Sequence, residues 1–255
     1  MDDGSERKAA TAEAFGEGAD GYLDSRAHGE GADLELLASW CAGATRALDV
    51  ATGAGHTAGA LADADVPTVV AADASPAMVA TCVGSFPGVR GVVADAERLP
   101  FAADAFDAVT CRIAAHHFPD PEAFLAEAAR VLRPGGTLAL EDNVAPDDAS
   151  LAAFLNCLER MRDPTHVESY TTATWRRWLA DAGFVVAETD RFVKTLRVDP
   201  WIDRMDLDAD GATAVRRFLR EAPPEARDFL DVAYEDGEVR SFGNPKALFR
   251  AERVG

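Results

Sequence analysis

One short segment, residues 47–58, constrains the fold of this chain more than any other. Residues 48–51 form a brief apolar run that contains one carboxylate, Asp49, and the run ends in a turn with glycine at positions 53 and 55. A helical pattern follows from His56. The order is therefore strand, glycine turn and helix. The two glycines remove Cβ atoms at the place where a ligand can lie against the backbone.

A second apolar run follows over residues 68–72 and ends at Asp73. An acidic residue about 20 positions after the first glycine of such a turn can bind the two hydroxyls of a ribose. The pattern is therefore typical of a βαβ unit that binds a nucleoside. The glycine spacing, with Ala58 in the third place of the fingerprint, does not by itself say which nucleoside.

Strands and helices alternate along most of the chain, which predicts a mostly parallel sheet with helices on both faces. The expected strands lie near residues 47–52, 68–73, 89–94, 106–111 and 137–140. The expected helices between them lie near residues 56–64, after Ser75-Pro76 and after Pro121. Later elements are a helix over 171–183, a short strand over 184–187 and one or two strands over 238–253.

The chain is expected to form an N-terminal helical cap, residues 1–45, and one domain, residues 46–255. The first 20 residues, in which Gly, Asp and Glu are scattered among alanines, are predicted to be mobile. Helical insertions in the domain are expected at about 147–165 and 200–235.

The charge of the chain limits the partners that it can bind. The formal net charge is −19, and three residues are lysine: Lys8, Lys194 and Lys246. A field of this sign repels nucleic acids and anionic membranes, so neither is an expected partner. The sequence has no apolar run as long as the roughly 18 residues that a membrane helix needs. Its polar, acidic start lacks a signal-peptide core, so we expect a cytoplasmic protein.

Three further features favour S-adenosylmethionine over NAD as the nucleoside. Asp49 lies inside the first strand, where its carboxylate can reach the amides of the loop or the ammonium group of the cofactor. Asp95 ends a strand just before a Leu-Pro-Phe turn and is placed to accept a hydrogen bond from the adenine amino group. Residues 132–138, Leu-Arg-Pro-Gly-Gly-Thr-Leu, form the third feature, a helix–turn–strand joint.

With these motifs, residues 47–143 resemble the class I S-adenosylmethionine-dependent methyltransferases of the ubiquinone/menaquinone-biosynthesis type. Residues 25–31, 111–118 and 162–166 are similar to an uncharacterised bacterial branch of that group. The resemblance implies a Rossmann-like α/β sheet of strand order 3-2-1-4-5-7-6, in which strand 7 is antiparallel and lies near Lys246–Glu252. His56-Thr57 replaces the third glycine of the loop that is common in the family.

The motifs and the resemblance together give a set of expected cofactor-binding residues. For Met78, packing in the core is an alternative role, and for Arg112 an ion pair with a helix carboxylate is an equal alternative. The set is Asp49, Thr52, Gly53, Gly55, Asp73, Ala74, Met78, Asp95, Ala96, Glu97 and Arg112.

Three histidines are candidate catalytic residues. His117 follows the fourth strand, where the carboxyl end of the sheet meets the cofactor methyl group, so it could orient an acceptor or act as a general base. His166 lies in the insertion that would cover the acceptor, and His28 lies in the segment that would close over the cofactor. Structural roles remain open for all three. His116 is a weaker candidate. No metal site is expected, because the five histidines do not form a metal spacing such as HxxxH, and because the adjacent His116 and His117 would point apart on an extended backbone.

The expected reaction is methyl transfer to a small and hydrophobic organic acceptor, carried out by a monomer or homodimer. The hydrophobic character rests on apolar residues after the fifth strand, for which packing of the late helices is an equal alternative. These residues are Phe154, Leu158, Trp175, Trp178, Phe192 and Trp201. Two other functions stay open: a non-methylating S-adenosylmethionine-binding protein, either a cyclase or a regulatory module, and an NAD-dependent oxidoreductase.

Overall fold

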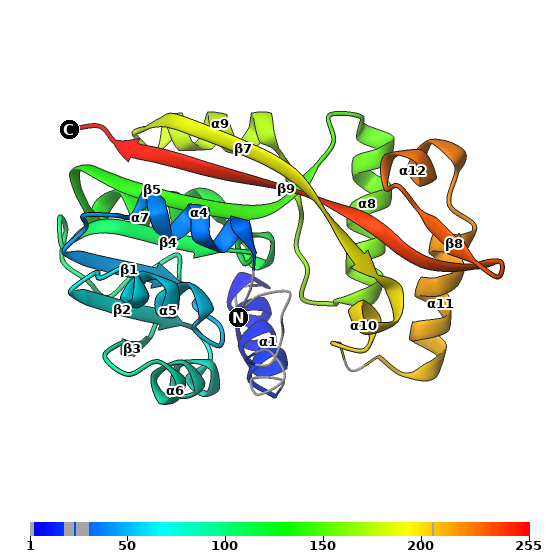
Figure 1. The fold of residues 1–255 in the computed structure, drawn as a ribbon, viewed down its shortest axis with the longest axis horizontal. Helices are drawn as coiled ribbons and strands as arrows, with labels where there is room; N and C mark the ends of the chain where they lie inside the picture. Colours follow the sequence, from blue (N-terminus) through cyan, green and yellow to red (C-terminus); the bar gives the residue numbers. More distant parts are fainter. Residues whose placement is uncertain (1–2, 18–22, 24–30, 206) are drawn as a thin grey trace.

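The fold is built on a mixed sheet in the order β3-β2-β1-β4-β5-β9-β7. This computed structural model describes residues 3–17, 23, 31–205 and 207–255 (Figure 1). The strands are β1 Arg46–Val50, β2 Thr68–Asp73, β3 Arg90–Val93, β4 Phe106–Arg112, β5 Leu132–Ala145, β7 Phe184–Arg197 and β9 Glu238–Arg253. Strands β3 to β5 are parallel, and β9 is antiparallel to β5 and β7. The predicted class I methyltransferase sheet is therefore confirmed.

Helices cover both faces of the sheet and create two apolar cores. One core contains Leu37, Leu61 and Cys82, and the other contains Phe124 and Trp175. The helices that contribute these residues are α4 Ala32–Trp40, α5 His56–Asp63, α6 Pro76–Ser85, α7 Pro121–Val131 and α9 Thr172–Asp181. Because both faces are covered, the central strands β1, β2 and β4 bury most of their residues on both faces and show no simple alternation of buried and exposed positions.

Several helices begin where the sequence predicts, because the residue before the helix caps it. The Ser75 hydroxyl accepts a hydrogen bond from the Met78 amide, and Pro76 occupies the first helical position of α6. Asp120 caps α7 in the same way and accepts from the Ala123 amide. Each cap fixes the point at which the chain leaves the carboxyl end of the sheet, which is the edge where ligands bind in such folds.

The last two long strands extend farther than the sequence predicts. The expected strand over 184–187 continues to Arg197 in β7, which pairs with β9 along its whole length. Residues 188–197 include charged side chains such as Asp190 and Lys194 because β7 is an edge strand, and edge strands carry charges that weaken their strand pattern.

A third apolar core lies beyond the end of the parallel sheet, where β7 and β9 reach the late helices (Figure 1). Trp201, Val215 and Phe242 are buried in this core. Its helices are α8 Ala149–Arg162, α10 Val198–Ile202, α11 Ala209–Arg220 and α12 Pro224–Phe229. Two short strands, β6 Tyr170–Thr171 and β8 Ala233–Glu235, pair with β5 and β9 respectively. The helices fall within or beside the expected insertions, while the division into domains stays a prediction.

The N-terminal segment forms a helix, α1 Asp3–Glu17, where the composition predicted a mobile segment. Alanine favours helix, and the Lys8 ammonium contacts the carboxylates of Asp95 and Glu97, which tie the helix to the end of β3. Figure 1 shows α1 beside the carboxyl ends of the parallel strands, where it contacts α6. Across the described ranges, no helix combines the length and the apolar character needed to cross a membrane.

Candidate functional site

A cavity of about 510 Å³ lies at the carboxyl ends of β1, β2 and β4, and α1 forms part of its wall. The volume falls within the range of about 300–1,000 Å³ that is common for small-molecule sites. Nine of the predicted cofactor-binding residues line this first cavity. They are Thr52, Gly53, Asp73, Ala74, Met78, Asp95, Ala96, Glu97 and Arg112.

The two loop glycines are required for different physical reasons. Gly53 has φ +53°, and a Cβ atom added there would meet nothing within 4 Å, so the backbone lies open to the cavity. Gly55 has φ +99°, and its Cβ would lie 2.5 Å from the Cys82 sulfur of α6. Gly55 does not line the cavity, although it was expected to bind the cofactor. Its hydrogen side chain lets α5 and α6 pack closely.

Asp73 holds the glycine loop and also lines the first cavity. Its Oδ2 accepts a hydrogen bond from the Gly53 amide at 2.9 Å, and its Oδ1 accepts from the Ser75 amide at 2.9 Å. Burial raises the pKa of this carboxyl above its ordinary value. Each carboxylate oxygen has a second lone pair, so the group can still accept from ligand hydroxyls.

Asp49 is buried below the loop and does not line the first cavity. Its two oxygens accept hydrogen bonds from the hydroxyls of Thr52, at 2.6 Å, and Thr110, at 2.7 Å. Burial raises its pKa to about 6, although these two hydrogen bonds act in the opposite direction. Asp49 therefore lies beneath the loop, and Thr52, which lines the first cavity, separates Asp49 from that cavity.

Arg112 lines the first cavity and also forms the ion pairs that the sequence left as an alternative. Its Nε donates to Glu141 Oε2 at 2.8 Å, and its Nη2 donates to Asp33 of helix α4 at 2.5 Å. The next residue, Ile113, has φ +53°, which is a strained conformation for a β-branched side chain. Strained backbone of this kind is concentrated at functional sites.

A second cavity of about 90 Å³ adjoins the first, and the two share Phe15, Ile113 and His117 as walls. The second cavity lies where β5, β7 and β9 meet α8. Its other lining residues are His116, Asn143, Glu159, Arg162, Asp163, Lys194, Leu196, Trp201, Arg204, Asn244 and Lys246.

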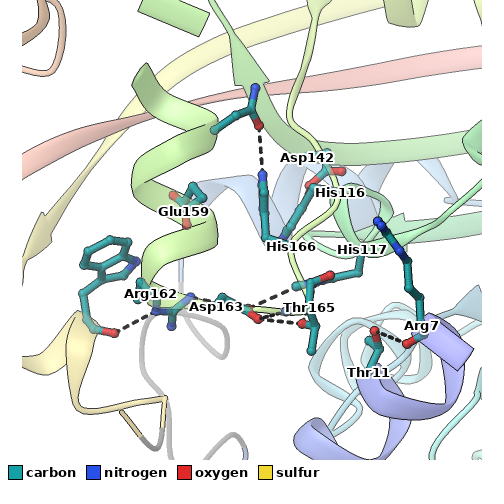
Figure 2. A network of polar contacts seen from close by, with 12 residues as sticks. Arg7, Thr11, His116, His117, Asp142, Glu159, Arg162, Asp163, Thr165 and His166 are labelled. Carbon is teal, nitrogen blue, oxygen red and sulfur yellow. Dashed lines mark hydrogen bonds and ion pairs between the residues drawn. The ribbon is translucent and has the colours of Figure 1, made fainter. Parts of the chain in front are cut away.

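His117 lines both cavities and so stands at their junction. Figure 2 shows it beside Thr165 and His116. Its Nδ1 lies 3.2 Å from the Thr165 carbonyl oxygen and 3.1 Å from the Thr165 hydroxyl. The Phe15 ring packs edge-on against it, with ring centroids 4.9 Å apart. Burial, together with the neighbouring His116, lowers the pKa of His117, so the ring is neutral near pH 7.

His116 and His117 lie side by side, so the prediction that they point apart is wrong. The backbone is not extended here: residues 115–117 form a turn of 3₁₀ helix, and the two ring centroids are 4.2 Å apart. His116 Nδ1 lies 2.5 Å from Asp142 Oδ1 and the side chain lines the second cavity (Figure 2). Asp142 follows Glu141 near the end of β5, directly after the apolar residues 138–140, and this change from apolar to acidic residues was the sequence signal that could have revealed the pair.

The other two candidate histidines do not join this site in the described structure. His166 lines neither cavity, because its Nε2 is bonded to Asn156 Oδ1 at 2.9 Å, and burial lowers its pKa to about 2. His28 lies outside the described residues. No group of three or more histidine, cysteine or acidic side chains is arranged to hold a metal ion in the part of the chain that is described.

Comparison with known proteins gives the class of this protein. The methyltransferase domain family matches residues 48–140. The uncharacterized methyltransferase YcgJ of Bacillus subtilis strain 168 is 35% identical over 237 residues, which are 89% of this chain and 93% of that protein. A proposed methyltransferase of Bacillus halodurans C-125 has a crystal structure that superposes with a TM-score of 0.84 at 37% identity, over 88% of this chain and all of the other.

The fold and the first cavity define a class I methyltransferase that uses S-adenosylmethionine as the methyl donor. This chain belongs to the methyltransferase domain family, and its relatives include enzymes of the predicted quinone-biosynthesis type. The demethylmenaquinone methyltransferase of Beutenbergia cavernae is 41% identical over 109 residues, which are 43% of this chain and 45% of that enzyme. The alternative of an NAD-dependent oxidoreductase is therefore wrong.

Proposed function

We propose that this enzyme methylates a small organic acceptor that binds in the second cavity, while S-adenosylmethionine occupies the first. The observation that carries the proposal is that the two cavities share Phe15, Ile113 and His117 as walls. A methyl group can therefore pass from one cavity to the other over a short distance. A regulatory module that only binds the cofactor would not require a second cavity at this junction, and transfer of the methyl group, measured as S-adenosylhomocysteine formation, distinguishes the proposal from a cyclase.

The residues of the first cavity fit the parts of S-adenosylmethionine. Asp73 would accept hydrogen bonds from the ribose hydroxyls, Gly53 leaves room for the amino acid part, and Asp95 lies where the adenine amino group is expected. When bound, the cofactor supplies a methyl group that bonds to the acceptor as the sulfonium sulfur keeps the electron pair of the broken S–C bond. The main task of the protein is alignment, which can supply about 7–11 kcal/mol.

A neutral His117 suits this junction. An imidazolium would repel the positive sulfonium, whereas burial and His116 keep the pKa of His117 low. The Thr165 carbonyl accepts from Nδ1–H and thereby fixes the ring, so that Nε2 carries the lone pair. With its pKa lowered, His117 accepts protons poorly near pH 7, and we assign it the role of orienting the acceptor.

His116 is the better candidate for general base. In the tautomer in which His116 Nδ1–H donates to Asp142 Oδ1, the lone pair of the ring lies on Nε2. Because the ring lines the second cavity, this nitrogen can take a proton from an acceptor hydroxyl, thiol or ammonium group as the new bond to carbon forms. His166, hydrogen-bonded to Asn156, would act from outside both cavities as a support for the insertion.

The expected hydrophobic character of the acceptor has little support in the packing. Phe154 stacks on Phe218 at 4.5 Å, and Trp175 and Trp178 are packed in the core of the sheet. Of the six apolar residues on which the expectation rested, Trp201 alone lines the second cavity. The polar lining of this cavity supports a small polar acceptor instead.

The test combines product analysis with two variants, Asp73→Asn and His117→Asn. The first should weaken cofactor binding, and the second should lower turnover. The purified enzyme, incubated with S-adenosylmethionine and a small-molecule extract, should form S-adenosylhomocysteine and a product heavier by one CH₂ group. Asp73→Asn should weaken cofactor binding by about 5- to 150-fold, as expected for about 1–3 kcal/mol of lost hydrogen bonding. Asp65→Asn, at an exposed position whose left-handed backbone tolerates asparagine, is the matched control.

His117→Asn keeps a donor for Thr165 and should lower turnover while cofactor affinity changes by less than about 5-fold, because a group that orients the acceptor acts in the transition state. Unchanged turnover in a folded His117→Asn enzyme would remove His117 from the proposal. Cofactor affinity that is unaffected by Asp73→Asn would remove the proposed cofactor pose.

A further inference from the structure

The second cavity collects positive charge in a strongly acidic protein. The net charge is −19 and the chain has three lysines, yet Lys194 and Lys246 both line this cavity of about 90 Å³. Arg162 and Arg204 line it as well. Lysine is scarce in this chain, so the presence of two of its three lysines in one cavity is not explained by composition.

The strand register brings these residues together. On β9, Asn244 and Lys246 are two residues apart, so they lie on the same face of the sheet. Asn143 of β5 is the register partner of Lys246, and Lys194 of β7 is the register partner of Asn244. Three adjacent strands therefore place two polar pairs, Asn143–Lys246 and Asn244–Lys194, on one face of the sheet. Glu159 and Arg162 of α8 line the cavity against this face.

Two carboxylates line the cavity, and both are already engaged. Asp163 Oδ1 accepts hydrogen bonds from the amide and the hydroxyl of Thr165. Its Oδ2 lies 3.9 Å from Arg162 Nη1 and 3.9 Å from His117 Nε2. Glu159 Oε1 accepts from Asn244 Nδ2 at 2.9 Å, and burial raises the pKa of Glu159, which favours its neutral form. The four cations therefore outweigh the negative charge in the lining.

The lysines themselves are poorly solvated. Burial lowers the pKa of Lys246 and of Lys194, although Glu141 lies close enough to both to act in the opposite direction. Lys246 Nζ donates to Asn143 Oδ1 at 2.5 Å, and an ammonium group has two further donors. Among the described residues, the buried Asn244 Oδ1 has no hydrogen-bond partner. Buried polar groups normally have partners, so this oxygen is suited to a donor group of a ligand.

We propose that the second cavity binds the carboxylate of a small organic acid between Lys194 and Lys246, and that the methyl acceptor is such an acid. This inference rests on the proposed function. A monoanion fits better than a phosphate dianion, because Glu159 and Asp163 share the same lining. The volume equals about three water molecules of liquid, which suits a compact acid with one further polar group, such as a hydroxyl that donates to Asn244 Oδ1.

The test measures binding of lactate and of its neutral analogue lactamide by calorimetry, with the enzyme saturated by S-adenosylhomocysteine. Lactate should bind at least about 10-fold more tightly than lactamide, because a charge-assisted hydrogen bond is lost in the amide. Lys194→Gln and Lys246→Gln should each reduce this preference by about 10-fold. Arg177→Gln removes a positive charge at an exposed position of α9 that lines neither cavity, and it should leave the preference for lactate unchanged.

The possible failures can be told apart. Equal affinities for lactate and lactamide in enzyme that binds S-adenosylhomocysteine would overturn the inference and leave the proposed function intact. Inorganic phosphate that binds more tightly than lactate would likewise overturn the carboxylate assignment. Failure of S-adenosylhomocysteine to bind at all would overturn the proposed function. If Lys246→Gln does not fold, the half-buried Lys194→Gln still decides the question.

Discussion

The buried carboxyl of Asp49 makes the stability of this enzyme depend on pH in an unusual direction. Asp49 lies in β1 beneath the glycine loop and is 1% exposed. Burial raises its pKa from 3.8 to about 6. The folded protein therefore holds this proton more tightly than the unfolded chain does. Replacement by asparagine, which has the same shape and no charge, removes the titration while the Thr52 and Thr110 hydroxyls keep a partner.

The magnitude follows from the size of the shift. One pKa unit corresponds to 1.36 kcal/mol, so the change from 3.8 to about 6 corresponds to about 3 kcal/mol. Below about pH 4 the carboxyl is protonated in both states, and the group costs nothing. As the pH rises through 6, the folded protein must ionise a buried acid, and the full cost appears. Asp49→Asn should therefore gain about 2 kcal/mol of stability relative to wild type between pH 4.5 and pH 7.5, because about 1 kcal/mol of the cost is already present at pH 4.5.

Urea unfolding followed by circular dichroism at several pH values measures this difference. The pH-independent part of the difference reports the change in hydrogen-bond geometry, and the pH-dependent part reports the titration of Asp49 alone. Other groups titrate equally in both proteins and cancel. A difference that stays flat across this range would refute the raised pKa. Wild type that gains stability over the variant as the pH rises would show that the ionised carboxylate is favoured, as an interaction with the loop amides would require.

Two further predictions concern the walls of the cavities. Gly53→Ala and Gly43→Ala both place alanine at positive φ with open space around the new Cβ, so each should cost about 1–2 kcal/mol of stability in urea unfolding. Only Gly53→Ala should also weaken S-adenosylmethionine binding, by about 10-fold in calorimetry, and equal binding by both variants would contradict the open-loop geometry. Phe15→Ala removes the ring that packs on His117 and should join the cavities, so turnover should shift toward bulkier acceptors; an unchanged acceptor profile would argue against a shared wall.

The wall of the cofactor cavity could be predicted from the sequence because its determinants are local. A strand, a glycine turn and a helix follow one another within a few residues, and Asp73 ends the neighbouring parallel strand. Backbone geometry then fixes where these residues lie, with little dependence on distant packing. Gly55 shows the limit of such prediction. The sequence indicated that position 55 needs glycine, but it did not reveal that the reason is close packing against Cys82 of another helix. Contacts between helices depend on tertiary packing that no local pattern encodes.

The positions and partners of the histidines could not be predicted from local sequence patterns. His116 and His117 were expected to diverge, but a 3₁₀ turn brings their rings together, and the pairing with Asp142 depends on a strand 26 residues away. His166 lies near both, with its ring centroid 5.4 Å from that of His116, yet its Nε2 bonds to Asn156. Local sequence does not encode the 3₁₀ turn or the distant partners Asp142 and Asn156, and these set where each imidazole ring lies.

The second cavity escaped prediction for a reason that lies in strand register. Lys194 and Lys246 are 52 positions apart in the sequence, and Lys246 meets Asn143 across a separation of 103. The expected strand over 184–187 left Lys194 outside any sheet. Had β7 been extended to Arg197, antiparallel pairing with β9 would have placed Lys194 opposite Asn244. Lys194 lines the second cavity, and charged residues such as Lys194 are also the reason that the second half of β7 was not predicted as a strand.

The contrast between surface and cavity bears on how an acid could reach this site. A protein of charge −19 repels anions at long range, but at about 0.1 M salt this repulsion is screened beyond about 10 Å. Inside the second cavity Lys246 is buried and Lys194 is half-buried, so the attraction of their ammonium groups for an anion is screened less. The surface charge therefore slows the encounter mainly at low salt, while the lining sets the affinity. The acidic surface therefore does not exclude an acidic acceptor, because the surface charge repels an anion at long range and the lysines of the second cavity attract it at short range.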